Sequence, residues 1–406
     1  MDKRVVITGM GIYSCLGKNL DEVRDALYNG VSGIIFDPVR KENGFRSGLT
    51  AQIEIPELKN ELSRNQRVFM PEQAKYAYAA TAEALKNAAL DPDYINDHEI
   101  GLLYGNDSSA EPTVKCVDIF REKRDTTRIG SGGIFQSMNS TVTMNLSCIF
   151  GLKGINLTVS GACASGSHAI GLGSLLIRHG YQDCVICGGA QEVNPFSVCS
   201  FDGISAFSVR ENEPAKASRP FDRDRDGLVP GGGAATVILE SYESAVKRGA
   251  PILAEVIGYG FSGNGEHISN PNVNGPQRSL LMAIKQAGID IREIGYVNAH
   301  ATSTLIGDRN EAKALHLVFG DHKPEVTSTK SQTGHEMWMA GASEVIYSML
   351  MMKGGFIAPN LNFENPDEDS ALLNIPSKRI GKHFDIFLSN SFGFGGTNSS
   401  LVIRNL

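Results

Sequence analysis

The sequence predicts an α/β fold made of two similar units that share one rigid body. Short β-branched runs alternate with segments of helical periodicity along 406 residues, a pattern typical of layered strands and helices. The alternation passes through the same order twice, once within residues 1–250 and again within residues 251–406, which indicates an internal repeat. Hydrophobic residues make up 41% of the chain and charged residues 20%, the profile of a compact enzyme.

In the first unit, short apolar runs predict strands, and longer segments with apolar residues at helical spacing predict helices. The unit opens on a strand directly after the charged N-terminus and closes on two consecutive strands. In chain order the elements are strand Val5–Gly9, helix Pro71–Ala89, strand Ile100–Tyr104, helix Ser140–Phe150, strand Ile155–Val159, helix Ala164–His179 and strands Cys184–Gly188 and Ala235–Leu239.

The second unit repeats this order, so that each unit is roughly β-α-β-α-β-α-β-β. Because helices alternate with strands, we expect mostly parallel sheets covered on both faces. The elements are strand Ile252–Tyr259, helix Pro276–Ala287, strand Ile294–Asn298, helix Asp308–Phe319, strand Glu325–Ser328, helix Ala342–Met352 and strands Ile386–Leu388 and Ser399–Arg404.

Composition argues against several classes of protein. A net charge of -7 disfavours nucleic acid as the main partner, because phosphate binding needs a concentrated positive face. The apolar run after Arg4 is too short for a secretion signal, and no apolar stretch approaches the ~18 residues of a membrane span. Seven cysteines lack the spacing of a disulfide framework. We therefore expect a soluble cytoplasmic protein with neither a membrane nor a nucleic-acid partner.

Two groups of basic residues are candidates for contact with an acidic protein. Such clusters are also common as plain solvated surface, and the sequence leaves both interpretations open. The groups are Arg64 with Arg67, and Arg121 with Lys123, Arg124 and Arg128.

Reactive groups in α/β folds gather beyond the carboxyl ends of strands. Three segments occupy such positions here: Ser160–Gly166, Asn298–Thr304 and Thr329–His335. If the two units are related by a pseudo-twofold axis, these segments can converge on one site.

Cys163 stands where a strand ends and a helix begins, among small residues that permit a sharp turn. The positive end of the helix favours the thiolate, so we expect a lowered cysteine pKa and a backbone N–H placed as half of an oxyanion hole. The alternative is one more inert buried thiol. Cys184 and Cys187 lie within an apolar strand and are interpreted as core, so we predict no metal site.

His300 and His335 each follow a predicted strand and have small or hydroxylated neighbours. They are expected to face a cavity, although capping or core roles stay open. Two glycine-rich segments, Asn390–Asn398 and Asp226–Gly233, suit either a loop close to a ligand or a tight hairpin.

With these motifs, the sequence resembles the beta-ketoacyl-[acyl-carrier-protein] synthases of the thiolase-like fold over nearly its whole length. The resemblance is strongest to the elongating type I enzymes. It is carried by four motifs: Val159–Gly166, Asn298–Thr304 followed by Gly307-Asp308, Ser328–His335 and Asn390–Asn398. Lys216–Asp222 and Arg225–Gly227 support it.

The resemblance implies a duplicated fold in five α-β-α-β-α layers, a homodimer and no cofactor. It implies that Cys163 carries an acyl chain, that His300 and His335 promote decarboxylation of malonyl-ACP, and that Lys330 tunes the site with Glu311 as a supporting residue. Phe394 would be the gate and would complete the oxyanion hole, and Thr302 and Thr304 would contact the pantetheine arm. An acidic acyl carrier protein, loaded with acyl or malonyl groups, would be the partner of the basic clusters.

The sequence departs from the family pattern after His335. A serine-like residue followed by Leu-Gly-Ala-Ala-Gly is usual there, whereas this chain has Glu336-Met337-Trp338-Met339-Ala340-Gly341. Ala301 stands where glycine is usual and Leu305 where proline is usual. The single tryptophan, Trp338, is expected to reshape the cavity, which leaves the acyl substrate open.

Other functions are compatible with parts of this pattern. They are a specialised polyketide or polyene synthase, an enzyme acting on coenzyme A thioesters, a non-catalytic chain-length partner subunit and a cysteine hydrolase. A thiolase is expected to use a second cysteine and one histidine, a partner subunit lacks the nucleophile, and a hydrolase needs neither Lys330 nor a second histidine.

Overall fold

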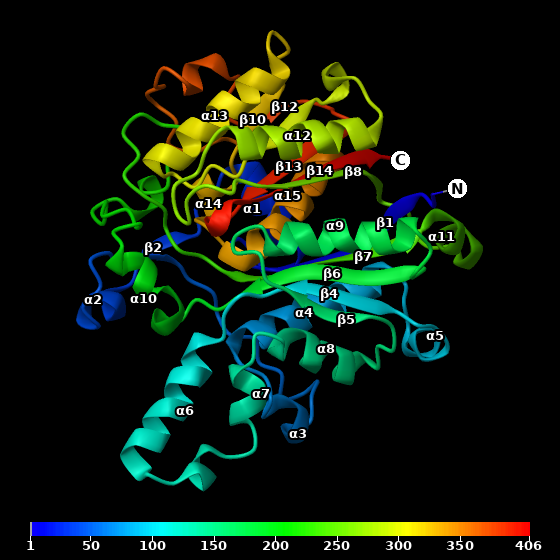
Figure 1. Cartoon of the computed structure of the whole chain (residues 1–406), viewed down its shortest axis with the longest axis vertical. Coiled ribbons are helices and arrows are strands. Elements are labelled where there is room, and N and C mark those ends of the chain that lie inside the picture. Colours follow the sequence, from blue (N-terminus) through cyan, green and yellow to red (C-terminus); the bar gives the residue numbers. More distant parts are fainter. Residues whose placement is uncertain (1) are drawn as a thin grey trace.

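The computed structural model describes residues 2–406 and has five layers, in which helices and strands alternate (Figure 1). Helices α4 (Glu72–Asn87) and α8 (Thr141–Phe150) cover the N-terminal strands, while α12 (Asn274–Ala287) and α13 (Leu305–Phe319) lie on the far side of the C-terminal strands. Between the two layers of strands lie α9 and α15, whose bounds are Ser165–Arg178 and Ala340–Gly354. The predicted five-layer α/β fold is confirmed.

The strands of the two halves follow the same order. In the sheet, the N-terminal half has the strand order β5-β4-β6-β7-β1 and the C-terminal half has the order β10-β9-β13-β14-β8. If the five strands of each half are renumbered 1 to 5 along the chain, both halves have the order 3-2-4-5-1. The halves join through a short antiparallel contact in which Val6 pairs with Glu255 and Ile7 with Ala254. The bounds are β1 Val5–Tyr13, β4 Gly101–Gly105, β5 Asn156–Val159, β6 Cys184–Gln191, β7 Gly233–Ser241, β8 Ala254–Gly263, β9 Tyr296–Asn298, β10 Glu325–Thr327, β13 Ile386–Phe392 and β14 Thr397–Asn405.

The expectation of mostly parallel sheets is wrong. Strand β4 is parallel to β5 and β6, and β9 is parallel to β10 and β13, but β7 and β14 are antiparallel to both of their neighbours. The last two strands of each half lie side by side, an arrangement that needs no crossover helix. The repeat therefore ends on an antiparallel pair in each half.

Paired glycines in the first strand of each half let the outer helix approach closely. A Cβ at Gly11 of β1 would lie 2.0 Å from the carbonyl oxygen of Ala80 in α4, and a Cβ at Gly260 of β8 would lie 1.9 Å from that of Ser279 in α12. At Gly9 and Gly258, two residues earlier, a Cβ would lie 2.4 Å and 2.3 Å from a helix carbonyl oxygen. Only a residue without a side chain fits at such backbone contacts.

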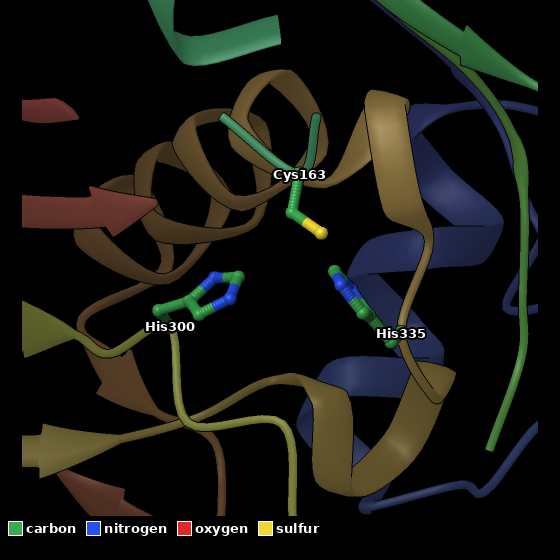
Figure 2. A group of neighbouring side chains, drawn as sticks. All are labelled: Cys163, His300 and His335. Atoms are coloured by element: carbon green, nitrogen blue, oxygen red, sulfur yellow. The ribbon is translucent and has the colours of Figure 1, made fainter. Parts of the chain in front are cut away.

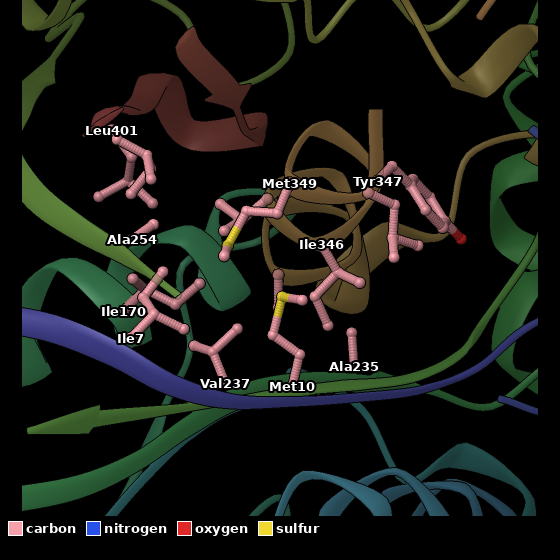
Figure 3. Packing of buried hydrophobic residues seen from close by; sticks show 14 of the residues in the cluster. Ile7, Met10, Ile170, Ala235, Val237, Ala254, Ile346, Tyr347, Met349 and Leu401 are labelled. Carbon is pink, nitrogen blue, oxygen red and sulfur yellow. The ribbon is translucent and has the colours of Figure 1, made fainter. Parts of the chain in front are cut away.

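The core of the middle layer is built on α15, which is buried along nearly its whole length. Figure 3 shows Ile346 and Met349 of this helix lying over Met10 of β1 and Val237 of β7. A helix that is apolar on every side belongs between two layers rather than on a surface. Along residues 2–406, no helix combines the length and the apolar character that crossing a membrane requires.

One long helix has no counterpart in the sequence prediction. Helix α6 (Ala110–Lys123) projects with α7 (Gly133–Ser137) at the lower end of Figure 1, and Pro112 is its one buried residue. Without a buried apolar stripe it lacks the periodic signal that identifies surface helices.

We predict that Gly260→Ala lowers the free energy of unfolding by about 3 kcal/mol, because overpacking at a backbone contact forces the helix and the strand apart. Gly263→Ala on the same strand is the control, since nothing lies within 4 Å of a Cβ there. Urea unfolding followed by circular dichroism measures both, and equal stability of the two variants would contradict the close-approach argument.

Candidate active site

The three segments that follow predicted strands meet at one buried point. Cys163 precedes α9, His300 follows β9, and His335 follows the short helix α14 (Lys330–Thr333). The sulfur of Cys163 and one ring nitrogen of each histidine lie within 4.8 Å of one another (Figure 2). All three residues are at most 9% exposed. The predicted convergence of these residues is therefore confirmed.

A strained turn presents Cys163 at the start of α9. Ala162 has a φ of 46°, a left-handed conformation that costs roughly 1–2 kcal/mol for a residue with a side chain. Its N–H donates to Oδ2 of Asp107 over 3.0 Å, and the N–H of Gly161 donates to Oγ of Ser165 over 2.8 Å. These two bonds hold the turn, and Asp107 is a positioning residue that the sequence analysis missed.

The expected lowering of the Cys163 pKa is wrong. Burial raises the pKa of this thiol to about 12, and the Lys330 cation and the N–H groups of Phe394 and Cys163 reduce the rise only in part. Loss of hydration around a buried thiolate outweighs the nearby positive groups. Cys163 is therefore a neutral thiol in the resting protein, with a cation and two donors ready to stabilise the negative charge that develops on reaction.

Each histidine is held by its backbone and leaves its ring free. The N–H of His300 donates to Oε1 of Glu311 over 2.9 Å, and the N–H of His335 donates to the carbonyl of Val229 over 2.7 Å. Among residues 2–406, Nδ1 of His300 and both ring nitrogens of His335 find no hydrogen-bond partner. Buried polar atoms without partners are rare and point to a ligand.

Burial and the Lys330 cation hold the pKa values of His300 and His335 well below their usual range. Both imidazoles are thus uncharged at neutral pH. A neutral imidazole has one N–H to donate and one nitrogen to accept, so the pair can donate hydrogen bonds to a developing oxyanion.

A buried ion pair lies behind the histidines. Nζ of Lys330 contacts Oε1 of Glu344 in α15, and both side chains are 1% exposed. Two further buried carboxyls, Glu311 and Glu336, lie near this lysine, and burial raises the pKa of each to about 7. Burial also raises the pKa of Glu344, and the Lys330 cation opposes that rise. Sequence reasoning found Lys330 and Glu311 but missed Glu344, because the sequence does not show that this side chain of α15 meets Lys330.

Glu311, to which the resemblance gave a supporting role, lies beside the loop that carries His300. Its carboxylate accepts from the backbone N–H groups of His300 and Ala301 and from Nδ2 of Asn390 in β13. One side chain thereby joins the histidine loop to the strand that leads into the glycine-rich loop.

A cavity of about 430 Å³ reaches the cluster, and Cys163, His300 and His335 line it. Thr302, Thr304 and Phe394 also line it, as predicted for residues near a bound substrate. Both glycine-rich segments take part: the loop of η6 (Phe394–Gly396) lines the cavity, and residues 229–231 bond to the backbone of His335. The sequence analysis did not find the contact of residues 229–231 with His335, because it joins segments that are far apart in the chain.

The loop that carries Thr302 and Thr304 is fixed by buried charges. Nε of Arg225 donates to the carbonyl of Thr304 over 3.0 Å, and Asp308 accepts from the N–H of Thr304 over 3.2 Å. The hydroxyls of the two threonines are 3.1 Å apart. This anchoring explains the Arg225 and Asp308 motifs in the sequence.

The predicted basic clusters lie on the surface and do not line the cavity. Arg64 and Arg67 form the ends of α3 (Arg64–Arg67), and the second group lies near the tip of α6 (Figure 1). Arg121, Lys123 and Arg128 have acidic neighbours within 4.0 Å, and such exposed pairs are weak.

A sulfur and two imidazoles are ligands that zinc accepts. The Lys330 cation lowers the pKa values of Cys163, His300 and His335, and the same positive charge opposes a divalent ion in this buried space. The thiol and the two imidazoles therefore suit a thioester carbonyl better than a metal ion.

Comparisons with known proteins agree with this geometry. Residues 2–245 match the model of the N-terminal domain of beta-ketoacyl synthases, and residues 253–364 match the model of their C-terminal domain. The chain is 39% identical to 3-oxoacyl-[acyl-carrier-protein] synthase 1 of Escherichia coli (strain K12), with 100% of this chain and 99% of the relative covered.

Solved structures show the same likeness. A beta-ketoacyl synthase from Burkholderia phymatum STM815 superposes with a TM-score of 0.95 at 36% identity, and the ishigamide ketosynthase/chain length factor with a TM-score of 0.91 at 29% identity, each covering 100% of both chains. Because both family models match in order and together span most of the sequence, the chain belongs to the beta-ketoacyl synthase family.

Proposed function

We propose that this protein is a 3-oxoacyl-ACP synthase that joins an acyl chain on Cys163 to malonyl-ACP with loss of carbon dioxide. The observation that carries the proposal is the buried group of one thiol and two neutral imidazoles within 4.8 Å of one another. Decarboxylation makes its own carbon nucleophile, so the reaction needs an oxyanion site and a dry cavity rather than a strong base.

In the first half-reaction, the sulfur of Cys163 attacks the thioester carbonyl of acyl-ACP. The N–H groups of Cys163 and Phe394, which also lower the pKa of the thiol, stabilise the oxyanion of the tetrahedral intermediate. The C–S bond to the carrier breaks, and the proton lost from Cys163 ends on the departing carrier thiol. A neutral histidine can pass that proton on.

In the second half-reaction, malonyl-ACP occupies the same cavity. Neutral His300 and His335 donate hydrogen bonds to its thioester oxygen while the carboxylate leaves as carbon dioxide, and an enolate remains. The enolate carbon attacks the acyl-Cys163 carbonyl, the new C–C bond forms and the C–S bond breaks. The cysteine sulfur takes up a proton, and 3-oxoacyl-ACP departs.

Lys330, Glu344 and Glu311 act as positioning residues in this proposal. Burial, together with the Lys330 cation, keeps both histidines neutral, and the same cation favours negative charge on Cys163. Glu344 balances the lysine, since an unpaired buried cation is costly. Glu311 orients His300. Thr302 and Thr304 would guide the pantetheine arm past Phe394.

The carrier protein and a second copy of this chain are the proposed partners. The relative in Escherichia coli is named for an acyl carrier protein, and the basic groups on α3 and α6 supply a positive docking face. Strand β5 is an edge strand with Leu157 54% exposed, and Ile134 of the projecting arm is 60% exposed. An open strand edge beside apolar side chains favours pairing with a second copy, so we propose a homodimer.

We also propose that the halves 1–250 and 251–406 are the two structural domains, as the repeated strand order supports. The seven cysteines of the described chain are free thiols, which supports a reducing cytoplasmic setting.

A second candidate is a ketosynthase for a specialised polyketide or polyene, favoured by Trp338 and by the likeness to the ishigamide ketosynthase. A non-catalytic partner subunit is disfavoured, because Cys163, His300 and His335 are all retained.

The first test is intact-protein mass spectrometry after incubation with acyl-ACP. We expect the wild type to gain one acyl mass and malonyl-ACP to discharge it as 3-oxoacyl-ACP, whereas Cys163→Ala gains nothing. Cys148→Ala, which removes an exposed thiol, is the control and should acylate normally. A folded wild type that no acyl-ACP modifies would overturn the proposal.

The second test uses alkylation by iodoacetamide as a function of pH. With a thiol pKa of about 12, the thiolate fraction, and with it the alkylation rate at Cys163, rises about tenfold per pH unit between pH 7 and 10 without a plateau. Lys330→Met removes a cation that lowers this pKa, so alkylation should slow further at every pH. If the alkylation rate instead reached a plateau below pH 8, the pKa of Cys163 would be lowered, as the sequence analysis expected.

The third test concerns the homodimer. Leu157→Lys together with Ile134→Lys introduces charges on the proposed interface, and light scattering should find a monomer. Leu317→Lys on α13, a site 59% exposed, is the control that stays dimeric. A monomeric wild type would refute the assembly.

A further inference from the structure

Cys163 belongs to a compact apolar cluster at one end of the cavity. The buried members are Phe45, Cys163, Val198, Phe207, Leu228, Met337 and Trp338. Cys163 and Leu228 line the cavity, whereas Met337 and Trp338 do not. The tryptophan therefore packs in the same apolar cluster as the reactive sulfur, outside the lining of the cavity.

The backbone around Trp338 is strained and tightly enclosed. Met337 has a φ of 45° and is fully buried, a conformation that persists only where the surroundings enforce it. The carbonyl oxygen of Trp338 would lie 2.6 Å from a Cβ at Gly189 and 3.0 Å from one at Gly166, on the first turn of α9. The segment that carries the indole is thus fixed against the helix that follows Cys163.

The indole itself is held in one orientation. Its Nε1–H donates to Oγ of Ser108 over 3.2 Å, and that hydroxyl donates to Oε1 of the buried Glu192 over 3.0 Å. On the cavity side, the ring of Phe201 lies 6.4 Å from the indole and 5.9 Å from the ring of Phe394, between centroids. Moving the indole would break the hydrogen bond and disturb the aromatic contacts next to the gate.

We infer that Trp338 is the residue that limits the length of the acyl chain on Cys163, and that the enzyme is selective for short acyl groups. This inference rests on the proposed function. An acyl chain attached to Cys163 extends into the apolar cluster, where the indole fills the volume behind the sulfur. Extra methylenes in a packed cluster are unfavourable. The family pattern has glycine at this position, which would leave the space open.

The test compares butanoyl-, octanoyl- and hexadecanoyl-ACP as acyl donors, with the rate of adduct formation on Cys163 measured by mass spectrometry. We expect wild type to take butanoyl at least about tenfold faster than hexadecanoyl, a ratio within the reach of steric exclusion in an apolar pocket. Trp338→Gly should accelerate hexadecanoyl transfer by about tenfold or more and leave butanoyl transfer nearly unchanged. Trp338→Phe, which keeps apolar bulk, is the control and should stay selective.

A second readout needs no variant at this position. Trp338 is the only tryptophan, so its emission reports directly on the cluster. Butanoylation of wild type should shift or quench the emission, and Cys163→Ala should show no change. Ser108→Ala, which removes the acceptor of the indole N–H, should weaken the preference for butanoyl if Trp338→Gly does not fold.

The outcomes separate the two levels of the argument. No adduct from any donor refutes the proposed function. The role of Trp338 would be overturned, with the proposed synthase function unaffected, by any of three results. They are adducts from all three donors at equal rates, unchanged selectivity in folded Trp338→Gly, and unchanged tryptophan emission on acylation.

Discussion

The structure depends on the close contact between the first turns of α9 and α15 in the middle layer. A Cβ at Gly166 would lie 3.0 Å from the amide nitrogen of Ala342, and a Cβ at Gly341 would lie 2.5 Å from that of Ser167. Small residues at both positions let two helix backbones nearly touch where the two halves of the fold meet. Cys163 directly precedes one of these helices, and the His335 segment leads into the other. The distance between Cys163 and His335 is therefore set by backbone packing, which is more rigid than side-chain placement.

Buried charge is the second constraint, and it follows from the first. A single lysine, Lys330, is surrounded by the carboxyls of Glu311, Glu336 and Glu344, all at most 2% exposed. Burial raises the pKa of each carboxyl, so the group can adjust its protonation and avoid an excess of negative charge. The lysine remains as a fixed positive potential beneath the histidines. Burial and that potential together keep the imidazoles uncharged, and an uncharged imidazole can still donate a hydrogen bond.

Much of this arrangement was accessible from the sequence, for reasons that also explain the failures. Apolar periodicity predicted every element of the repeat, and strand ends predicted the meeting of Cys163, His300 and His335. Strand direction was misjudged because periodicity carries no information on which strands pair. The pKa of Cys163 was misjudged because helix ends are visible in a sequence but burial at one atom is not. Asp107 was missed because it acts through one contact between segments that are distant in the chain, and Glu344 was missed because the sequence does not show which side chain of α15 meets Lys330.

The repeated strand order divides the chemistry between two copies of one topology. The N-terminal copy supplies the thiol and the C-terminal copy supplies the histidines and the lysine, so neither copy is sufficient alone. Any insertion that shifts one copy against the other would separate the reacting atoms. A segment added between two repeated elements does not shift the copies against each other. The arm around α6, which is inserted between β4 and α8, is an example. Evolution can therefore exchange such inserted arms while the relative placement of the thiol, the imidazoles and the lysine is inherited unchanged.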